Sequence, residues 1–255
     1  MISICIPCTN RPRKLFEAIC SILMQGVSGI ELVLKDNSAV PVTEDPCVAA
    51  ALKLLPGSVN YRAGEPLPLF RSVNDCMERA TGDIRYFMGD DDLLAPGALI
   101  SVLEAFEGER FPNVFWVVGK TISADQHGRT QGIDGGPTTY EKMLECNRIG
   151  GPSVFVGRGI AALTGKFDTR YSLAADYDYW LRLWRWREPM FIDRVLGIYR
   201  HHEGQTSVTK RDELEREAKM ISERHKNFGD LIRNAHAIQQ CRLAYGAEGF
   251  PPEHA

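Results

Sequence analysis

Short apolar runs and helical patterns alternate along the first 120 residues of the chain. The apolar runs predict β-strands, because they are short, rich in β-branched residues and bounded by turn-forming residues. These strands are expected at residues 2–6, 30–34, 59–62, 84–88 and 114–118. Apolar residues at helical spacing predict intervening helices at residues 12–26, 48–55, 72–79 and 96–107. Strands that alternate with helices indicate an α/β fold, in which a mostly parallel sheet carries helices on both faces.

The pattern is looser beyond residue 120. Glycines and a proline at 128–137 predict a long loop, and helices are expected at 140–146 and 176–187. Gly150–Ser153 precedes an apolar run, which predicts a tight loop that enters a strand. This loop either approaches a ligand or only turns the chain. The polar segment from about 212 to 244 predicts a C-terminal helical extension, which is suited to pairing two subunits as a homodimer.

Composition excludes several classes of protein. The 255 residues carry 30 Lys and Arg against 33 Asp and Glu, a net charge of −3 that argues against a nucleic-acid partner. The seven cysteines lack zinc-site spacing, which favours reduced thiols in a reducing compartment. The longest uncharged stretch, 18–30, is too short for a bilayer span, which needs roughly 20 apolar residues. With no basic, apolar leader at the start, we expect a cytoplasmic protein or one at the cytoplasmic face of a membrane.

Three consecutive carboxylates, Asp90, Asp91 and Asp92, directly follow the strand expected at 84–88. Adjacent carboxylates repel one another, and their burial without partners is costly. A divalent cation would relieve this repulsion and also hold phosphate oxygens. Ligands of parallel sheets bind beyond the carboxyl ends of the strands, where this cluster is expected. The alternative is a solvated acidic loop whose last Asp helps to cap the next helix.

Other candidate residues each have a structural alternative. Asp36 follows the strand at 30–34, where it either accepts a hydrogen bond from a nucleotide base or forms a turn with Asn37 and Ser38. Asp176 and Asp178 begin a predicted helix. Each either interacts favourably with the positive end of the helix dipole or acts as a general base.

The helix expected at 176–187 is also rich in Trp and Arg. Trp180 and Trp184 share one of its faces, which indicates core packing or contact with a membrane-bound, lipid-linked acceptor. No dinucleotide-binding or P-loop glycine motif occurs, which argues against a dehydrogenase or a P-loop NTPase.

Six segments together resemble family 2 glycosyltransferases of the GT-A fold. In chain order they are ISICIPCTNRP from residue 2, DNS from 36, YFMGDDDLLAPGAL from 86, GKFD from 165, ADYDYWLRL from 175 and YRHHEGQTS from 199. The resemblance covers about residues 2–207. It implies a GT-A domain over 1–207, with a nucleotide-binding half (1–100) and an acceptor-binding half (101–207), followed by the helical extension at 208–255.

The resemblance also implies roles for individual residues. The nucleotide-sugar site would comprise Pro7, Thr9, Asn10, Arg11, Asp36, Asn74, Asp90 and Asp91. Within it, Arg11 would lie near the phosphates and Asp36 at the base. Asp92 would be the chief ligand of a Mn²⁺ or Mg²⁺ ion, and His202 matches a histidine that approaches the metal; a packing role for His202 is the alternative. Asp176 would be the general base, although Ala175 stands where the family has Glu, which leaves Asp178 as a substitute.

The implied activity is transfer of a sugar from a UDP-, GDP- or dTDP-sugar to a saccharide or lipid-linked acceptor. One base and no enzyme nucleophile would invert the anomeric configuration. Two alternatives remain at this point: a catalytically silent GT-A domain that binds nucleotide-sugar or carbohydrate, and a nucleotidyltransferase. The chain lacks the glycine-rich amino-terminal loop that a nucleotidyltransferase would have, since CTNRPRK contains no glycine.

Overall fold

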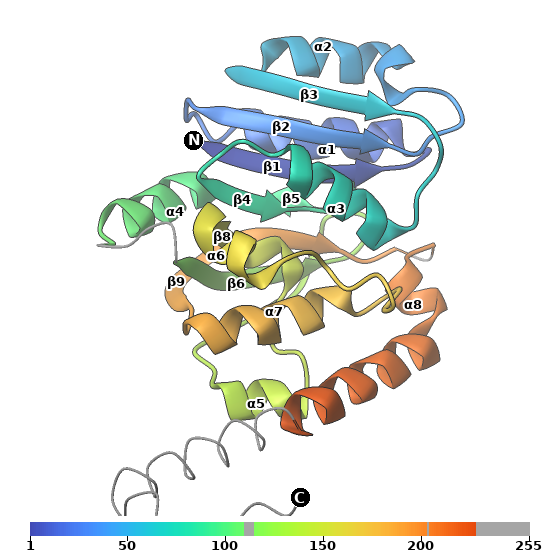
Figure 1. Ribbon diagram of the computed structural model, residues 1–255. Coiled ribbons are helices and arrows are strands. Elements are labelled where there is room, and N and C mark those ends of the chain that lie inside the picture. The colour runs from blue at the N-terminus through green and yellow to red at the C-terminus, as the bar shows by residue number, and fades with distance from the viewer. Residues whose placement is uncertain (110–114, 203, 228–255) are drawn as a thin grey trace, which may run out of the picture.

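The computed structural model describes residues 1–109, 115–202 and 204–227, which form a helix-covered mixed sheet (Figure 1). Its amino-terminal half is parallel, as the alternating pattern predicts. The strands β1 (Ile2–Cys8), β2 (Ile30–Asp36), β3 (Gly57–Ala63) and β4 (Ile84–Phe87) lie in the order β3-β2-β1-β4. The carboxyl ends of β1, β2 and β4 therefore meet at one edge of the sheet, where ligands of parallel sheets bind.

The other half of the sheet mixes both directions. Next to β4 come β8 (Val154–Gly157), β6 (Trp116–Ala124), β9 (Met190–Arg200) and β5 (Leu93–Leu94). Of these neighbours only β6 and β9 pair in parallel. The loop predicted at 128–137 is partly wrong, because β7 (Thr130–Asp134) pairs antiparallel with β6 there. Its residues are mostly exposed, so the strand carries no apolar alternation that a sequence could reveal.

Helices cover both faces of the sheet, as predicted. On one face α1 (Pro12–Leu23), α2 (Pro46–Leu54) and α4 (Ala98–Glu107) pack into one apolar cluster. On the other face α3 (Leu69–Arg79), α6 (Arg158–Thr164) and α7 (Ala175–Trp186) pack into a second. Figure 1 shows α3, α6 and α7 in front of the sheet, with α1 behind it.

The remaining helices lie in the second half of the chain. They are α5 (Tyr140–Glu145), the short α8 (Thr206–Thr209) and a helix at 211–227. This last helix packs against the second cluster through the fully buried Ile221 and through Leu214 and Ala218. The rest of the predicted extension lies outside the described residues.

Two tryptophans of α7 pack in the core. Trp180 and Trp184 are both buried in the second cluster, so packing, and not contact with a membrane, accounts for their shared face. Among the residues that the structure describes, no helix is both long and apolar enough to cross a bilayer.

Candidate active site

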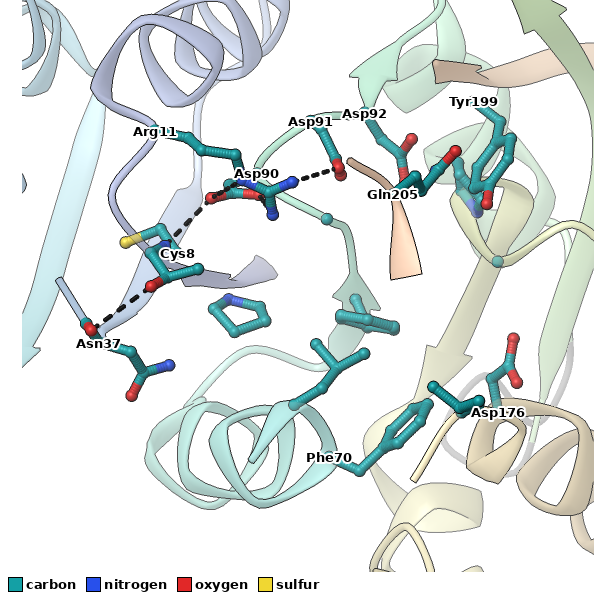
Figure 2. Close-up of a pocket in the computed structure, with 18 of the residues that line it drawn as sticks. Cys8, Arg11, Asn37, Phe70, Asp90, Asp91, Asp92, Asp176, Tyr199 and Gln205 are labelled. Carbon is teal, nitrogen blue, oxygen red and sulfur yellow. Dashed lines mark hydrogen bonds and ion pairs between the residues drawn. The ribbon is translucent and has the colours of Figure 1, made fainter. Parts of the chain in front are cut away.

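A cavity of about 410 Å³ opens at the carboxyl ends of the parallel strands. The loop after β1 contributes Thr9 and Arg11, and the loop after β4 contributes Asp90, Asp91 and Asp92. Asp176, in the first turn of α7, lines the same cavity. Figure 2 shows Asp176 well apart from the acidic cluster, across the open space. The fold thus gathers most of the predicted site residues around one cavity.

Arg11 holds the acidic cluster together. Its Nη2 donates to Oδ1 of Asp90 at 2.5 Å, and its Nη1 donates to Oδ2 of Asp91 at 2.7 Å. The backbone N–H of Thr9 also donates to Asp90, at 3.2 Å. These contacts join the loops after β1 and β4, as the dashed lines in Figure 2 show. Although burial works against its charge, Asp90 and Asp91 raise the pKa of Arg11, which therefore stays cationic.

A single guanidinium does not neutralise three buried carboxylates. Burial, reinforced by repulsion from Asp91, raises the pKa of Asp90 to about 6 despite the contact with Arg11. Burial and the same repulsion raise the pKa of Asp92. For Asp91, the effect of burial is overcome by Arg11 and His202, which lower its pKa. The cluster therefore retains an excess of negative charge, which favours a further cation.

The carboxyl end of β9 reaches the same cluster. Nε2 of His202 lies 2.9 Å from Oδ2 of Asp91, which places His202 beside the acids as the resemblance implies. The backbone N–H of Arg200 donates to Oδ1 of Asp92 at 3.3 Å. The Arg200 side chain donates to the carbonyl of Asp91 and to Glu17. The loop after β4 is thereby fixed from two sides, by β9 and by Arg11.

Gly89 directly precedes the acidic cluster, and the local packing favours this glycine. A Cβ at residue 89 would lie 2.6 Å from Oδ1 of Asp91 and 3.1 Å from Oδ2 of Asp92. No larger side chain fits unless these carboxylates move. Asp91 and Asp92 therefore occupy space that a side chain at residue 89 would need.

Two predicted nucleotide-site residues are engaged within the protein. The Asp36 carboxylate accepts hydrogen bonds from the backbone N–H groups of Ser38 and Val42 and from the hydroxyl of Tyr61, at 2.7–2.9 Å. The amide of Asn74 bonds both backbone groups of Phe167 at 2.9 Å. Neither residue lines the cavity, so the structure does not bring these two to the other site residues. Asn37, next to Asp36, does line it.

The other predicted residues of the amino-terminal loop differ in their placement. Pro7 and Thr9 line the cavity, whereas Asn10 lies outside its lining. Asn10 has a φ of 49°, in the left-handed region that Asn tolerates better than most residues. Its backbone N–H donates to the Ser38 hydroxyl at 2.7 Å, and its side-chain oxygen accepts from Ala39 N–H at 3.1 Å. Asn10 therefore ties the loops after β1 and β2 together at the rim.

Asp176 and Asp178 occupy different environments. Asp176 is half-buried at the cavity, and its Oδ1 accepts a hydrogen bond from Tyr177 N–H at 2.8 Å. Burial raises its pKa to about 6. A general base works best when its pKa lies near the pH at which the enzyme operates, and this shift brings Asp176 closer to neutral pH. Asp178 is fully buried away from the cavity, 2.7 Å from Arg182 Nε and 2.9 Å from His225 Nε2. Of the two alternatives, only Asp176 is placed to reach a ligand in the cavity.

The acidic cluster suits a divalent ion, although it is not a complete protein cage. Among the described residues, no three or more His, Cys, Asp and Glu side chains are arranged as a metal-binding group. However, three adjacent carboxylates are buried beside one guanidinium, that of Arg11, and carboxylates are the ligands that hard cations prefer. Mg²⁺ commonly takes only one or two carboxylates from the protein and completes its shell with water and substrate phosphates. The donor set fits that arrangement.

Sequence reasoning did not find several residues of the cavity. Tyr199 and Gln205 line it near Asp92, and Figure 2 shows both beside the cluster. Within the described part of the chain, the buried Oε1 of Gln205 has no hydrogen-bond partner. The part of the wall towards α3 and α7 is apolar. It includes Leu69, Phe70, Phe87, Leu173 and Leu214.

The fold and the cavity define a class of α/β protein with a ligand-sized cavity at the carboxyl ends of parallel strands, lined by an acidic cluster and by a further carboxylate. Comparison with known proteins specifies this class. The sequence profile of glycosyl transferase family 2 matches residues 3–161, more than half of the chain. The chain therefore belongs to glycosyl transferase family 2. It is a glycosyltransferase that transfers a sugar from a nucleotide-sugar, and the nucleotidyltransferase alternative is set aside.

Several relatives are similar over most of the chain. An uncharacterized protein of Mycobacterium tuberculosis is 30% identical over 240 residues, which cover 85% of this chain and 73% of that protein. A PGL/p-HBAD biosynthesis glycosyltransferase of M. tuberculosis is 27% identical over 198 residues, or 78% of this chain and 74% of the relative. An uncharacterized glycosyltransferase of Haemophilus influenzae is 25% identical over 96% of this chain and 84% of the relative.

Solved structures confirm the expected GT-A fold. Staphylococcus aureus TarS matches with a TM-score of 0.59 at 15% identity, over 78% of this chain but only 36% of the TarS chain. TarS 1–349 in complex with UDP matches with a TM-score of 0.57, also at 15% identity, over 78% of this chain and 60% of that one. The present chain thus spans little more than a third of the first TarS chain and about three fifths of TarS 1–349.

Proposed function

We propose that this glycosyltransferase binds a nucleoside diphosphate sugar at the acidic cluster and transfers the sugar, with inversion, to an acceptor hydroxyl deprotonated by Asp176. The observation that carries the proposal is that the cluster and Asp176 open onto one cavity from opposite sides. A cavity of about 410 Å³ falls in the usual range of small-ligand sites. UDP- and UDP-GlcNAc-bound TarS structures share the fold, which supports a nucleotide-sugar donor.

The donor end of the site needs positive charge. A diphosphate placed beside Asp90, Asp91 and Asp92 would be repelled, because Arg11 offsets only part of their charge. Asp92, with His202 nearby, would hold a Mn²⁺ or Mg²⁺ ion at this end of the cavity. When bound, this ion would supply Lewis-acid stabilisation of the departing diphosphate. Pro7, Thr9 and Asn37 line the cavity where the nucleoside would lie.

The acceptor end offers a single carboxylate. Asp176 is positioned at the wall, and its raised pKa makes it a stronger base than an ordinary Asp. Its carboxylate would take the proton of the acceptor hydroxyl while that oxygen attacks the anomeric carbon. The bond from that carbon to the diphosphate breaks in the same displacement, so the product has the inverted configuration. A product that retains the donor's configuration would contradict this mechanism.

The apolar part of the cavity wall favours a lipid-linked acceptor, or one joined to another apolar group, over a free saccharide. Phe70, Phe87, Leu173 and Leu214 line the cavity on the side of Asp176, and Leu69 is 45% exposed. A free saccharide would leave much of this surface without an apolar partner. An acceptor sugar joined to an alkyl or aryl group would cover it, which stabilises the complex by roughly 25 cal/mol per Å² of apolar surface buried.

The test starts with donor binding. Calorimetric titration with UDP, GDP, CDP and dTDP, each with and without Mn²⁺, should show tighter binding of one nucleotide in the presence of Mn²⁺. Asp92→Ala should abolish this tightening. Asp193→Ala is the matched control, because Asp193 is 75% exposed and pairs with Lys120 on the surface. If no nucleotide binds under either condition, the donor site is wrongly assigned.

The preferred nucleotide then selects the sugar donors for a transfer assay. Free saccharides are compared with their alkyl and aryl glycosides, and release of the nucleoside diphosphate is followed with and without acceptor. We expect the glycosides to have the lower KM. Equal KM values for free and alkylated acceptors would contradict the assignment of the apolar wall but would leave the donor site intact.

A further inference from the structure

We propose that Glu217, on the helix at 211–227, is a positioning residue that fixes the start of α7 and thereby aims the carboxylate of Asp176 into the cavity. The inference rests on the proposed function, in which Asp176 is the base. It gives the C-terminal helix a role in the active site.

Glu217 is bonded to the segment that leads into α7. Its Oε1 accepts hydrogen bonds from the backbone N–H and the hydroxyl of Ser172, at 2.7 and 2.8 Å. Its Oε2 accepts from the N–H groups of Leu173 and Ala174, at 2.8 and 2.9 Å. One carboxylate therefore holds three consecutive backbone N–H groups that immediately precede the helix.

The sequence of α7 explains why it needs this partner. The N-cap of α7 is Ala174, which has no side chain able to accept the free N–H groups of the first turn. A Ser, Thr, Asp or Asn in that position would do so locally. Glu217 instead acts from a distant part of the chain: it accepts from the N–H groups of residues 172–174, up to the N-cap itself, and places a negative charge at the positive end of the helix.

The position of this contact links it to catalysis. Asp176 follows Ala174 by two residues, within the first turn of α7. Leu173, one of the residues held by Glu217, lines the same cavity as Asp176. A shift of the 172–174 segment would therefore move both the base and the adjacent wall. Misplacement by about 1 Å can cost roughly a hundredfold in rate.

The helix that carries Glu217 is itself firmly anchored. Ile221 is fully buried, and the hydroxyl of Ser222 donates to the carbonyl of Leu144. Further along the helix, Nε2 of His225 lies 2.9 Å from Oδ1 of Asp178. Although partial burial opposes it, the hydrogen bonds from residues 172–174 lower the pKa of Glu217, which is therefore charged at neutral pH.

The experiment combines amide hydrogen exchange with transfer kinetics on Glu217→Ala and Glu217→Gln. Glu217→Gln keeps the size of the side chain but loses the charge and one acceptor, so it decides the matter if Glu217→Ala does not fold. Glu215→Ala is the matched control, because Glu215 is exposed on the same helix and pairs with Arg211. We expect faster exchange at residues 173–174 and a fall in kcat of roughly 10- to 100-fold in Glu217→Ala. Glu217→Gln should have a smaller effect, and donor affinity should be unchanged in both variants.

The other outcomes distinguish failure of this inference from failure of the proposed function. Unchanged exchange at 173–174 in both Glu217 variants would overturn the inference and leave the proposed function standing. Faster exchange with unchanged kcat would mean that Glu217 only stabilises the fold, which also overturns it. Equal loss of kcat in Glu215→Ala would do the same. By contrast, Asp176→Asn with wild-type turnover would remove the proposed base, and the positioning role would fall with it.

Discussion

The carboxylates at the two ends of the cavity differ in their partners. At the donor end, Asp90 and Asp91 are paired with Arg11, and Asp91 also contacts His202. At the acceptor end, Asp176 has only a backbone partner, Tyr177 N–H, and among the described residues no Lys, Arg or His pairs with it. Both ends are buried enough to raise the pKa of a carboxyl group to about 6.

This difference matches the two roles proposed for these acids, binding at one end and proton transfer at the other. Carboxylates that are tied to cations hold a fixed geometry and suit the binding of a metal ion and a diphosphate. A carboxylate without a cationic partner keeps its affinity for a proton, which a general base requires. The comparison therefore teaches that, in the proposed mechanism, the partners of each acid distinguish its role, since residue type and a pKa of about 6 are common to Asp90 and Asp176.

The sharpest test of this comparison is Asp176→Asn. The change keeps the size of the side chain and removes its ability to take a proton, so we expect kcat to fall by about a thousandfold. Donor affinity should be unchanged, because the donor end is left intact. Steady-state transfer kinetics and calorimetric titration with the nucleotide measure the two effects. A fall of kcat by less than about tenfold would mean that another group is the base.

Asp178→Asn tests the other acid of α7. Asp178 is fully buried between Arg182 and His225, and removal of its charge leaves Arg182 without its ionic partner. We expect the free energy of unfolding to fall by about 3 kcal/mol, measured by denaturant titration. Because Asp178 lies outside the cavity, the folded variant should keep its KM for donor and acceptor. A folded Asp178→Asn protein with wild-type stability and no turnover would reverse the roles of the two acids.

The roles of these acids also show how far the sequence alone leads. The placement of Asp90 to Asp92 and of Asp176 was predictable, because the acids directly follow a buried strand or begin a patterned helix. The choice between Asp176 and Asp178 was not, because His225 lies 47 residues from Asp178 along the chain. Helical spacing cannot reveal which face of α7 such a distant partner covers.

The elements of the fold also divide into those that the sequence predicts and those that it does not. The buried strands β1 and β2 are apolar along most of their length, so the parallel half of the sheet was predictable. Strand β9 was missed, since Asp193, Arg194 and Gly197 interrupt its apolar residues. The assignment of Asp36 to the base rested on the resemblance, and the turn that its residue type favours is present in the structure. Whether Asp36 also contacts a nucleotide stays a prediction.

Arg11→Gln tests the donor end, with a smaller expected effect. Without the guanidinium, Asp90 and Asp91 lose their shared cationic partner, and we expect a loss of about 2 kcal/mol in unfolding free energy. Addition of Mn²⁺ should stabilise this variant more than the wild type, because the ion would replace part of the missing charge. Thermal denaturation with and without Mn²⁺ measures this effect.

Arg13→Gln is the matched control for Arg11→Gln. The Arg13 side chain is 93% exposed and pairs only across the surface of α1 with Glu17. This variant should keep the stability of the wild type and its response to Mn²⁺. If Arg11→Gln shows no additional stabilisation by Mn²⁺, the donor end carries no charge excess for the ion to relieve.

The smallest effect is a pH dependence that isolates Asp176. Burial raises its pKa from 3.8 to about 6, so between these values the folded protein holds a proton that the unfolded chain releases. The contribution of Asp176 to the unfolding free energy should therefore fall as the pH rises from about 4 to about 6, by about 1 kcal/mol after allowance for solvent screening. Asp90 has a similarly raised pKa, but its contribution cancels when the wild type is compared with Asp176→Asn.

Denaturant titrations of both proteins at pH 4.5 and 7 should thus give nearly equal stabilities at the lower pH and a more stable Asp176→Asn at the higher. An equal difference at both pH values would show that Asp176 is ionised as readily as an exposed carboxylate, and the contrast between the two ends of the cavity would then rest on geometry alone.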